Sequence, residues 1–128
     1  PVKYKNIFFR NNEAAFQGAK IEGNFDSKTK KSLKDFSTLP PNVAKSLGRR
    51  INLRPDWEQV KDEIMLELVR SKFSSVKMKR MLLATGEHEL IEGNTWGDSY
   101  WGYDLVKNHG QNHLGKILMQ VRQELREN

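Results

Sequence analysis

Two apolar stripes at helical spacing constrain what this chain can fold into. They consist of Trp57, Val60, Ile64 and Leu68 in the middle of the sequence, and of Leu114, Ile117, Leu118, Val121 and Leu125 near its end. Apolar residues that recur every three or four positions lie on one face of an α-helix and pack against a core. Asp56, with Gln59 three residues later, is typical of a capping box at a helix start. We therefore expect one helix from Asp56 to about Phe73 and a second, core-facing helix through the last stripe.

Shorter elements are indicated by residues that start and stop helices. These signals predict four further helices: from Asn11 or Asn12 to about Glu22, from Asp26 or Ser27 to about Phe36, from Pro41 to Gly48, and from Ser74 or Ser75 to Leu83. The run Val2–Phe9 predicts one or two short strands, and Leu90–Ile91 a short extended piece. The fold class is therefore mainly α, a compact single domain over residues 1–128 with about six helices and a small β element near the N-terminus.

Composition excludes several chemistries. The chain has no cysteine, which removes disulfides, thiolate catalysis and cysteine-ligated zinc. His109 and His113 are four residues apart, but Gly110 separates them in an expected loop, so we expect no metal and no cofactor. The sequence carries no glycine-rich dinucleotide motif, P-loop or nucleophile elbow, and the corresponding enzyme classes lack support.

The basic charge favours anionic partners. A formal net charge of +6 suits phosphates or nucleic acid. Most of the basic residues are dispersed and are expected on solvated helix faces. The exception is the group Arg49, Arg50 and Arg54, which lies in a short link where the side chains can converge on a phosphate. The alternative is packing, or ion pairing with Glu58 or Asp62. No apolar run approaches the roughly 20 residues of a membrane span, no signal peptide is recognised, and we expect a cytoplasmic protein.

The segment Trp96–Gly102, W-G-D-S-Y-W-G, is a candidate ligand site. Two tryptophans flank Asp98, and a tryptophan in a polar loop is costly unless its ring face or N–H has a partner. An acid between aromatic planes suits a flat, polar ligand. The alternative is that Asp98 is a turn residue that stabilises Gly97. Of the two tryptophans, we expect Trp96 to pack and Trp101 to contact the ligand.

A second candidate lies on the expected helix after Asn12. With about 3.6 residues per turn, Glu13, Gln17 and Lys20 share one face of that helix. A carboxylate held by a lysine in a cleft can stabilise a sugar cation or activate water, and Asp98 would supply the second acid of a pair. An ordinary Glu–Lys surface pair is the alternative.

Six segments occur in the order typical of one family. They are N-E-A-A-F-Q-G-A-K (Asn12–Lys20), G-R-R-I-N-L-R-P-D-W (Gly48–Trp57), K-D-E-I-M (Lys61–Met65), L-L-A-T-G (Leu82–Gly86), L-I-E-G-N-T-W-G-D-S-Y-W-G (Leu90–Gly102) and G-Q-N-H-L-G-K-I-L-M-Q-V-R (Gly110–Arg122). Together they resemble the NADAR (YbiA-like) family over nearly the whole chain. Each motif alone is weak, whereas the ordered set is specific.

The resemblance implies a compact, mainly helical domain that hydrolyses N-glycosidic bonds. Carried over by motif position, Glu13 is the leading catalytic carboxylate and Asp98 the second, while Trp57 and Trp101 border the base or sugar. The polar substrate contacts implied in the same way are Lys20, Arg50, Gly102 and Asn112.

Two departures from the family pattern limit this transfer. Members usually carry an F-L-S-N-F-like segment before the first Glu motif, and the sequence begins after that point, at Pro1. We therefore expect part of the contact shell to be missing or supplied differently. Ala14 stands where many members have His, so no role of that histidine is carried over.

Three functions are compatible with these motifs. The first is hydrolysis of a phosphorylated ribosylamino-pyrimidine, an intermediate of riboflavin synthesis. The second is removal of ADP-ribose from modified guanine in nucleic acid, which the basic charge would suit. The third is a non-catalytic module that binds ADP-ribose or an NAD-like ligand. The expected partner is in each case a phosphorylated, nucleoside-like molecule, free or in a nucleic acid, and the oligomeric state is left open.

Overall fold

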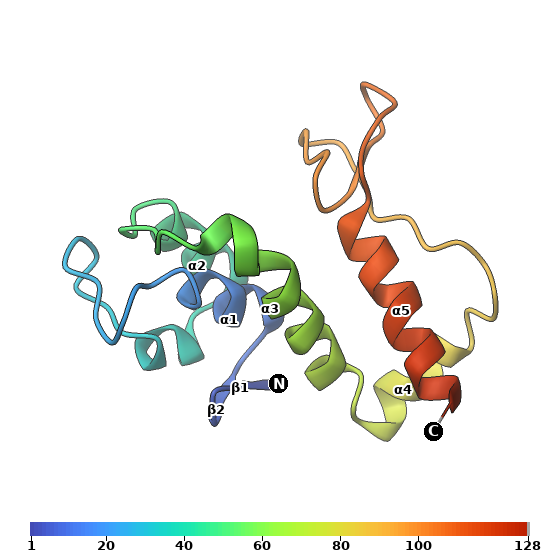
Figure 1. Ribbon diagram of the computed structural model, residues 1–128, viewed down its shortest axis with the longest axis horizontal. Coiled ribbons are helices and arrows are strands. Elements are labelled where there is room, and N and C mark those ends of the chain that lie inside the picture. Colours follow the sequence, from blue (N-terminus) through green and yellow to red (C-terminus); the bar gives the residue numbers. More distant parts are fainter. Residues whose placement is uncertain (128) are drawn as a thin grey trace. The chain divides into compact units, whose positions relative to one another are not determined.

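The computed structural model describes residues 1–127 and divides into two compact units, Pro1–Lys72 and the part from Phe73 onward. The described residues form five α-helices, one 3-10 helix and two small sheets (Figure 1). A mainly helical architecture is therefore confirmed, although five α-helices replace the expected six or so. None of the described helices is long and apolar enough to cross a membrane.

The first unit begins with a hairpin. Strands β1 (Val2–Tyr4) and β2 (Ile7–Phe9) pair antiparallel, with Val2 opposite Phe9. Lys5 and Asn6 form the two-residue turn at φ values of 47° and 63°, the left-handed conformation that such tight hairpins require. The strands expected within residues 2–9 are thus confirmed.

Helix α1 (Asn12–Gly18) is the centre of the first unit. Asn11 caps it, because the Asn11 side chain accepts a hydrogen bond of 2.7 Å from the Ala14 N–H. The prediction that this helix reaches Glu22 is wrong. Ile21 instead forms an isolated antiparallel bridge with Leu53, and the Lys20 carbonyl accepts from the backbone N–H of Arg54, so the chain leaves the helix to pair with a distant segment.

The helix expected from Asp26 or Ser27 to Phe36 is also wrong. Asp26 is buried, and its carboxylate accepts hydrogen bonds from the Thr29 N–H at 2.7 Å, the Thr29 hydroxyl at 2.5 Å and the Asn52 N–H at 2.9 Å. A side chain that binds nearby backbone donors competes with helix formation. The segment therefore turns, and only the 3-10 helix η1 (Lys34–Thr38) follows.

Helices α2 (Pro41–Gly48) and α3 (Trp57–Lys72) complete the first unit as expected. Pro41 opens α2, where a missing N–H costs nothing. At the start of α3 the structure departs from the proposed capping box, since both carboxylate oxygens of Asp56 accept from the Arg54 guanidinium, at 2.6 and 2.9 Å. Helix α1 contacts α2, α3, η1 and both strands.

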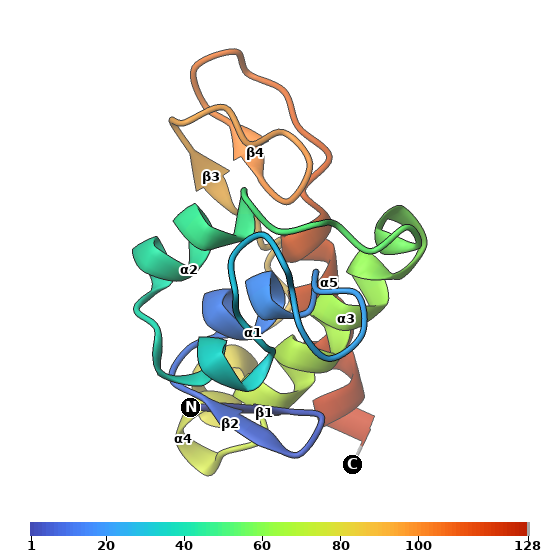
Figure 2. The same cartoon turned by 90° about the vertical axis from the view of Figure 1, so that its left-hand side faces the viewer.

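The second unit contains α4 (Val76–Leu83), capped by Ser75, and α5 (His113–Glu127). Between them β3 (Gly93–Asn94) and β4 (Tyr103–Asp104) form a short parallel pair (Figure 2). Both helices were expected. Leu90 and Ile91, predicted to be extended, lie outside the strands, and β3 begins at Gly93.

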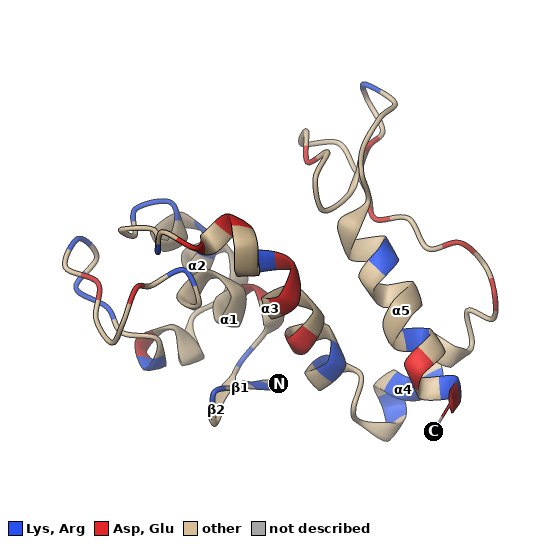
Figure 3. Cartoon of the chain, viewed as in Figure 1, with Lys and Arg blue, Asp and Glu red and all other residues tan. Residues whose placement is uncertain are grey.

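Arg122 of α5 fixes the segment that follows α4. It is buried and donates to the Thr85 hydroxyl at 2.8 Å and to the His88 carbonyl at 2.9 Å. Arg126, one turn later, donates to the Gly86 carbonyl. The other basic residues are spread over loops and helices of both units, as their dispersal in the sequence indicates (Figure 3).

The Asp26 turn generates a prediction about stability. Burial alone would raise the pKa of Asp26, but the hydrogen bonds from Thr29 and Asn52 outweigh it and lower this pKa. The resulting stabilisation is present above the ordinary aspartate pKa and is lost as the pH falls through the folded-state value. We expect Asp26→Ala to lower the free energy of unfolding by about 1–3 kcal/mol at pH 7.

Urea unfolding at pH 7 and at pH 2.5–3 checks this. The difference in the free energy of unfolding between wild type and Asp26→Ala should be smaller at the lower pH. The control is Glu22→Ala, at an exposed position, which should have the wild-type free energy of unfolding at both pH values. A difference that stays constant with pH would show that the carboxylate charge does not contribute.

Candidate functional site

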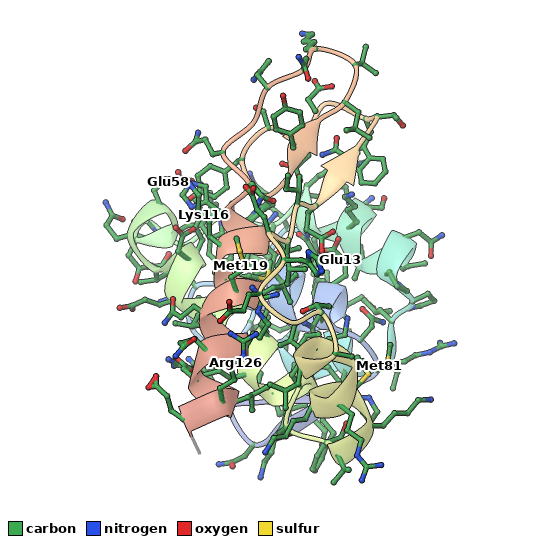
Figure 4. All side chains as sticks on the ribbon, turned by 90° about the vertical axis from the view of Figure 1, so that its right-hand side faces the viewer. Glu13, Glu58, Met81, Lys116, Met119 and Arg126 are labelled. Carbon is green, nitrogen blue, oxygen red and sulfur yellow. The ribbon has the colours of Figure 1, made fainter. Side chains whose placement is uncertain are left out.

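Three predicted site residues of the first unit, Glu13, Lys20 and Trp57, lie on or next to helix α1. We call Glu13, Phe16, Gln17, Lys20 and Trp57 the Glu13 cluster. Glu13 is half-buried in the first turn of α1 (Figure 4), where the partial positive charge of the helix N-terminus favours a carboxylate. Its Oε2 accepts a hydrogen bond of 3.0 Å from Nε2 of the buried Gln17. The carboxylate is thereby oriented from within the protein.

Lys20 and Trp57 complete this cluster. The Lys20 ammonium lies 5.9 Å from the centre of the Trp57 ring, within reach of a cation–π attraction. Burial lowers the pKa of Lys20, the charge of Glu13 opposes this shift, and that of Arg49 adds to it. A half-buried ammonium beside a carboxylate and an aromatic face can hold a polar, anionic ligand.

Trp57 has a clear structural role. Its side chain is 6% exposed, and its ring packs at 57° against Phe16 with the ring centres 5.0 Å apart. The tryptophan therefore anchors the start of α3 on α1. Its contact with a base or sugar stays a prediction.

The arginines of the link between α2 and α3 differ in their exposure to solvent. Arg54 is half-buried, pairs with Asp56 rather than with Glu58 or Asp62, and donates to the Ala19 carbonyl at 3.4 Å. The side chain of Arg50 is exposed. Arg54 thus holds the link against the end of α1, and Arg50 is accessible to a solute, which leaves its predicted phosphate contact untested.

Asp98, in the second unit, organises its own loop. Its Oδ1 accepts hydrogen bonds from the backbone N–H groups of Tyr100, at 3.1 Å, and Trp101, at 3.0 Å. The buried Asn94 binds the Asp98 backbone on both sides, accepting from its N–H at 3.0 Å and donating to its carbonyl at 2.7 Å. Asp98 is thus a turn residue, although its side chain binds Tyr100 and Trp101 rather than Gly97. A catalytic role of Asp98 stays a prediction.

Aromatic rings gather next to Asp98. The Tyr100 ring stacks on the His113 imidazole, with ring centres 4.2 Å apart and planes at 9°, and Trp101 meets Tyr100 edge-on at 4.9 Å. The sequence predicted a role for Trp101. It did not predict the Tyr100–His113 stack, because that contact depends on where His113 lies at the start of α5. Trp96, which we expected to pack, is 72% exposed, so that prediction is wrong.

Gly102 and Asn112 hold the backbone of this loop. A Cβ on Gly102 would collide with the Glu92 carbonyl and the Asn94 amide, so only glycine fits there. The buried Asn112 accepts from the Glu92 N–H at 2.9 Å and donates to the Leu90 carbonyl at 2.8 Å. Both residues have structural roles, and their substrate contacts stay predictions.

A groove of about 410 Å³ runs along the start of α5. Asn112, His113, Lys116 and Met119 line it together with Tyr103, and Figure 4 labels Lys116 and Met119 on the helix. Within residues 1–127 no three His, Asp or Glu side chains are grouped so as to hold a metal ion.

The family model of the NADAR domain matches residues 1–126. The chain belongs to the NADAR domain family. N-glycosidase YbiA of Escherichia coli is 34% identical over 98% of this chain and 76% of its own length. An N-glycosidase of Nostoc punctiforme is 37% identical over 98% of this chain and 80% of its own.

Two further likenesses bear on this NADAR domain. The NMR structure of E. coli YbiA matches it with a TM-score of 0.83 at 30% identity, covering 99% of this chain and 73% of that one. A riboflavin biosynthesis protein of Vibrio vulnificus is 45% identical over 75 residues, which are 58% of this chain and 20% of that protein. The family expected from the ordered motifs is therefore confirmed, as is the enzyme class, hydrolysis of N-glycosyl bonds.

The Asp98 loop generates a second prediction. Replacing Asp98 by Ala removes two acceptor contacts, each worth about 1 kcal/mol, so we expect the amide protons of Tyr100 and Trp101 to exchange at least about tenfold faster. Hydrogen exchange followed by NMR measures this. The exposed Thr95→Ala in the same loop is the control and should leave these rates unchanged. Unchanged exchange in Asp98→Ala would contradict the capping role.

Proposed function

We propose that this NADAR domain hydrolyses the N-glycosidic bond of a phosphorylated ribosylamino-pyrimidine. The observation that supports it most is the carboxylate of Glu13, hydrogen-bonded by Gln17 at 3.0 Å and accompanied by Lys20 and Trp57. N-glycosidic cleavage passes through a cation-like ribosyl group that a fixed carboxylate stabilises. The name of the Vibrio relative supports a substrate of the riboflavin type.

The proposed reaction needs one water molecule. The C1′–N bond breaks with its electron pair going to nitrogen, the ribosyl cation is stabilised by the Glu13 carboxylate, and the water oxygen bonds to C1′. Glu13 takes a proton from that water and passes it to the leaving nitrogen, so that the carboxylate is regenerated. The products are the free amino-pyrimidine and the ribose phosphate.

Asp98 is proposed as the second carboxylate. Because its Oδ1 already accepts from the N–H groups of Tyr100 and Trp101, any part in the reaction falls to Oδ2. The residues proposed to contact the substrate are Lys20, Arg50, Trp57, Trp101, Gly102 and Asn112. Of these, Lys20 and Arg50 carry the positive charge that a phosphate requires.

The role of Glu13 is tested by Glu13→Gln. We expect release of the base from a ribosylamino-pyrimidine phosphate to slow at least about a hundredfold, because the amide can neither stabilise the cation nor accept the proton. The exposed Glu63→Gln is the matched control and should keep the wild-type rate. Equal rates in Glu13→Gln and wild type would remove Glu13 from the reaction.

The same assay distinguishes substrates. Hydrolysis of ADP-ribosylated guanine by the wild type, with the ribosylamino-pyrimidine left intact, would contradict the proposed substrate. Binding of either compound without turnover would contradict catalysis altogether.

The phosphate contact is tested by Arg50→Ala. We expect KM for the phosphorylated substrate to rise about 10-fold or more, with kcat nearly unchanged, because a charge-assisted hydrogen bond is worth about 1.5–3 kcal/mol. The dephosphorylated substrate should show the same KM in both proteins. An equal rise in KM for both substrates would show that Arg50 does not bind the phosphate group.

A further inference from the structure

Gln17 is the buried polar residue at the centre of the first unit that the proposed reaction does not use. Its side chain is 6% exposed. Burying an amide costs free energy unless its polar atoms form hydrogen bonds. Nε2 donates to Oε2 of Glu13, but within residues 1–127 the buried Oε1 has no hydrogen-bond partner. An apolar side chain would fill this position without leaving an acceptor unsatisfied.

Gly48, in the last turn of α2, fixes the other side of this amide. A Cβ at position 48 would take the place of Oε1 of Gln17 and lie 2.7 Å from its Cδ. Glycine is less favourable than alanine within a helix by roughly 0.5–1 kcal/mol, so its presence here has a packing reason. The absent side chain lets α2 approach and confine the amide of Gln17.

The chain of contacts therefore runs from Gly48 through Gln17 to Glu13. The terminal torsion of a glutamate is broad, and a free carboxylate samples many orientations. A hydrogen bond to Oε2 from an immobile donor selects one of them and leaves the other oxygen, Oε1, for a ligand. Lys20 is the charged neighbour in the Glu13 cluster, and the charge of Glu13 acts to raise the pKa of Lys20.

We propose that Gln17 is a positioning residue: confined by Gly48, its amide holds the Glu13 carboxylate in the orientation that reacts. This inference rests on the proposed function of Glu13. Gln17 touches neither substrate nor water in this role. It acts only through Glu13, and that property separates it from a substrate contact and from a residue that merely fills the core.

The first test is Gln17→Met, which keeps the size and removes the donor. We expect kcat for base release to fall about 10- to 100-fold, the value of a hydrogen bond to a charged group, while KM changes less than about threefold. The decisive comparison is a double-mutant cycle. In the Glu13→Gln background, Gln17→Met should lower the remaining rate less than about twofold, because its effect passes through the missing carboxylate. The same fold-loss in both backgrounds would overturn the proposal.

The second test approaches the amide from α2. Gly48→Ala displaces Gln17 without altering either side chain of the pair, and we expect it to reduce kcat as Gln17→Met does. Ser46→Ala, at an exposed position of the same helix, is the control and should keep wild-type kinetics. Unchanged kcat in a folded Gly48→Ala would overturn the confining role of Gly48.

A third measurement needs no substitution at Gln17. In the NMR spectrum of the wild type, the side-chain amide protons of Gln17 should be shifted and slow to exchange, and Glu13→Ala should abolish both effects. An unchanged Gln17 amide signal in Glu13→Ala would overturn the proposal even if Gln17→Met does not fold. If Glu13→Gln is fully active, the proposed role of Glu13 fails and this inference fails with it. If Glu13→Gln is inactive and Gln17→Met keeps the wild-type kcat, this inference alone fails.

Discussion

Helix α1 can be closely surrounded because three of its seven residues are small. Ala14, Ala15 and Gly18 are buried within it, and the helix contacts α2, α3, η1 and both strands of the hairpin. Close approach of helices depends on small side chains at the contact, and here it brings a buried amide and a half-buried carboxylate into the interior of the unit. The chemistry proposed for Glu13 follows from this packing, because a carboxylate among closely packed helices has few orientations.

The second unit is built on a different principle, in which polar side chains satisfy backbone groups of an irregular loop. Asp98 and Asn94 bind the backbone of the W-G-D-S-Y-W-G segment, and Asn112 bridges residues 90–92. The carbonyls of Tyr100 and Trp101 accept from the first N–H groups of α5. A loop held by so many hydrogen bonds presents its aromatic rings in fixed positions.

The sequence predicted those elements whose signals are local. The proline at the start of α2, the serine cap of α4 and the apolar stripes of α3 and α5 all act within one or two helical turns. The prediction failed where a residue distant in the sequence determines the local structure. Asp26 binds Asn52, and Ile21 pairs with Leu53, so neither the turn after Asp26 nor the early end of α1 is encoded nearby. At the candidate site, helical spacing correctly placed Gln17 next to Glu13, whereas Lys20 lies beyond the end of α1. The Tyr100–His113 stack and the buried Arg122 depend on tertiary contacts.

The central claim is that the substrate binds at the Glu13 cluster of the first unit. The chain has three tryptophans, and each gives one indole N–H signal, so a titration with ribose 5-phosphate and the amino-pyrimidine product followed by NMR reports on all of them at once. The account predicts that the signal of Trp57 shifts with saturation while that of the exposed Trp96 stays in place. A shift of Trp96 alone, or a Trp57 signal that does not move at saturating ligand, would contradict it.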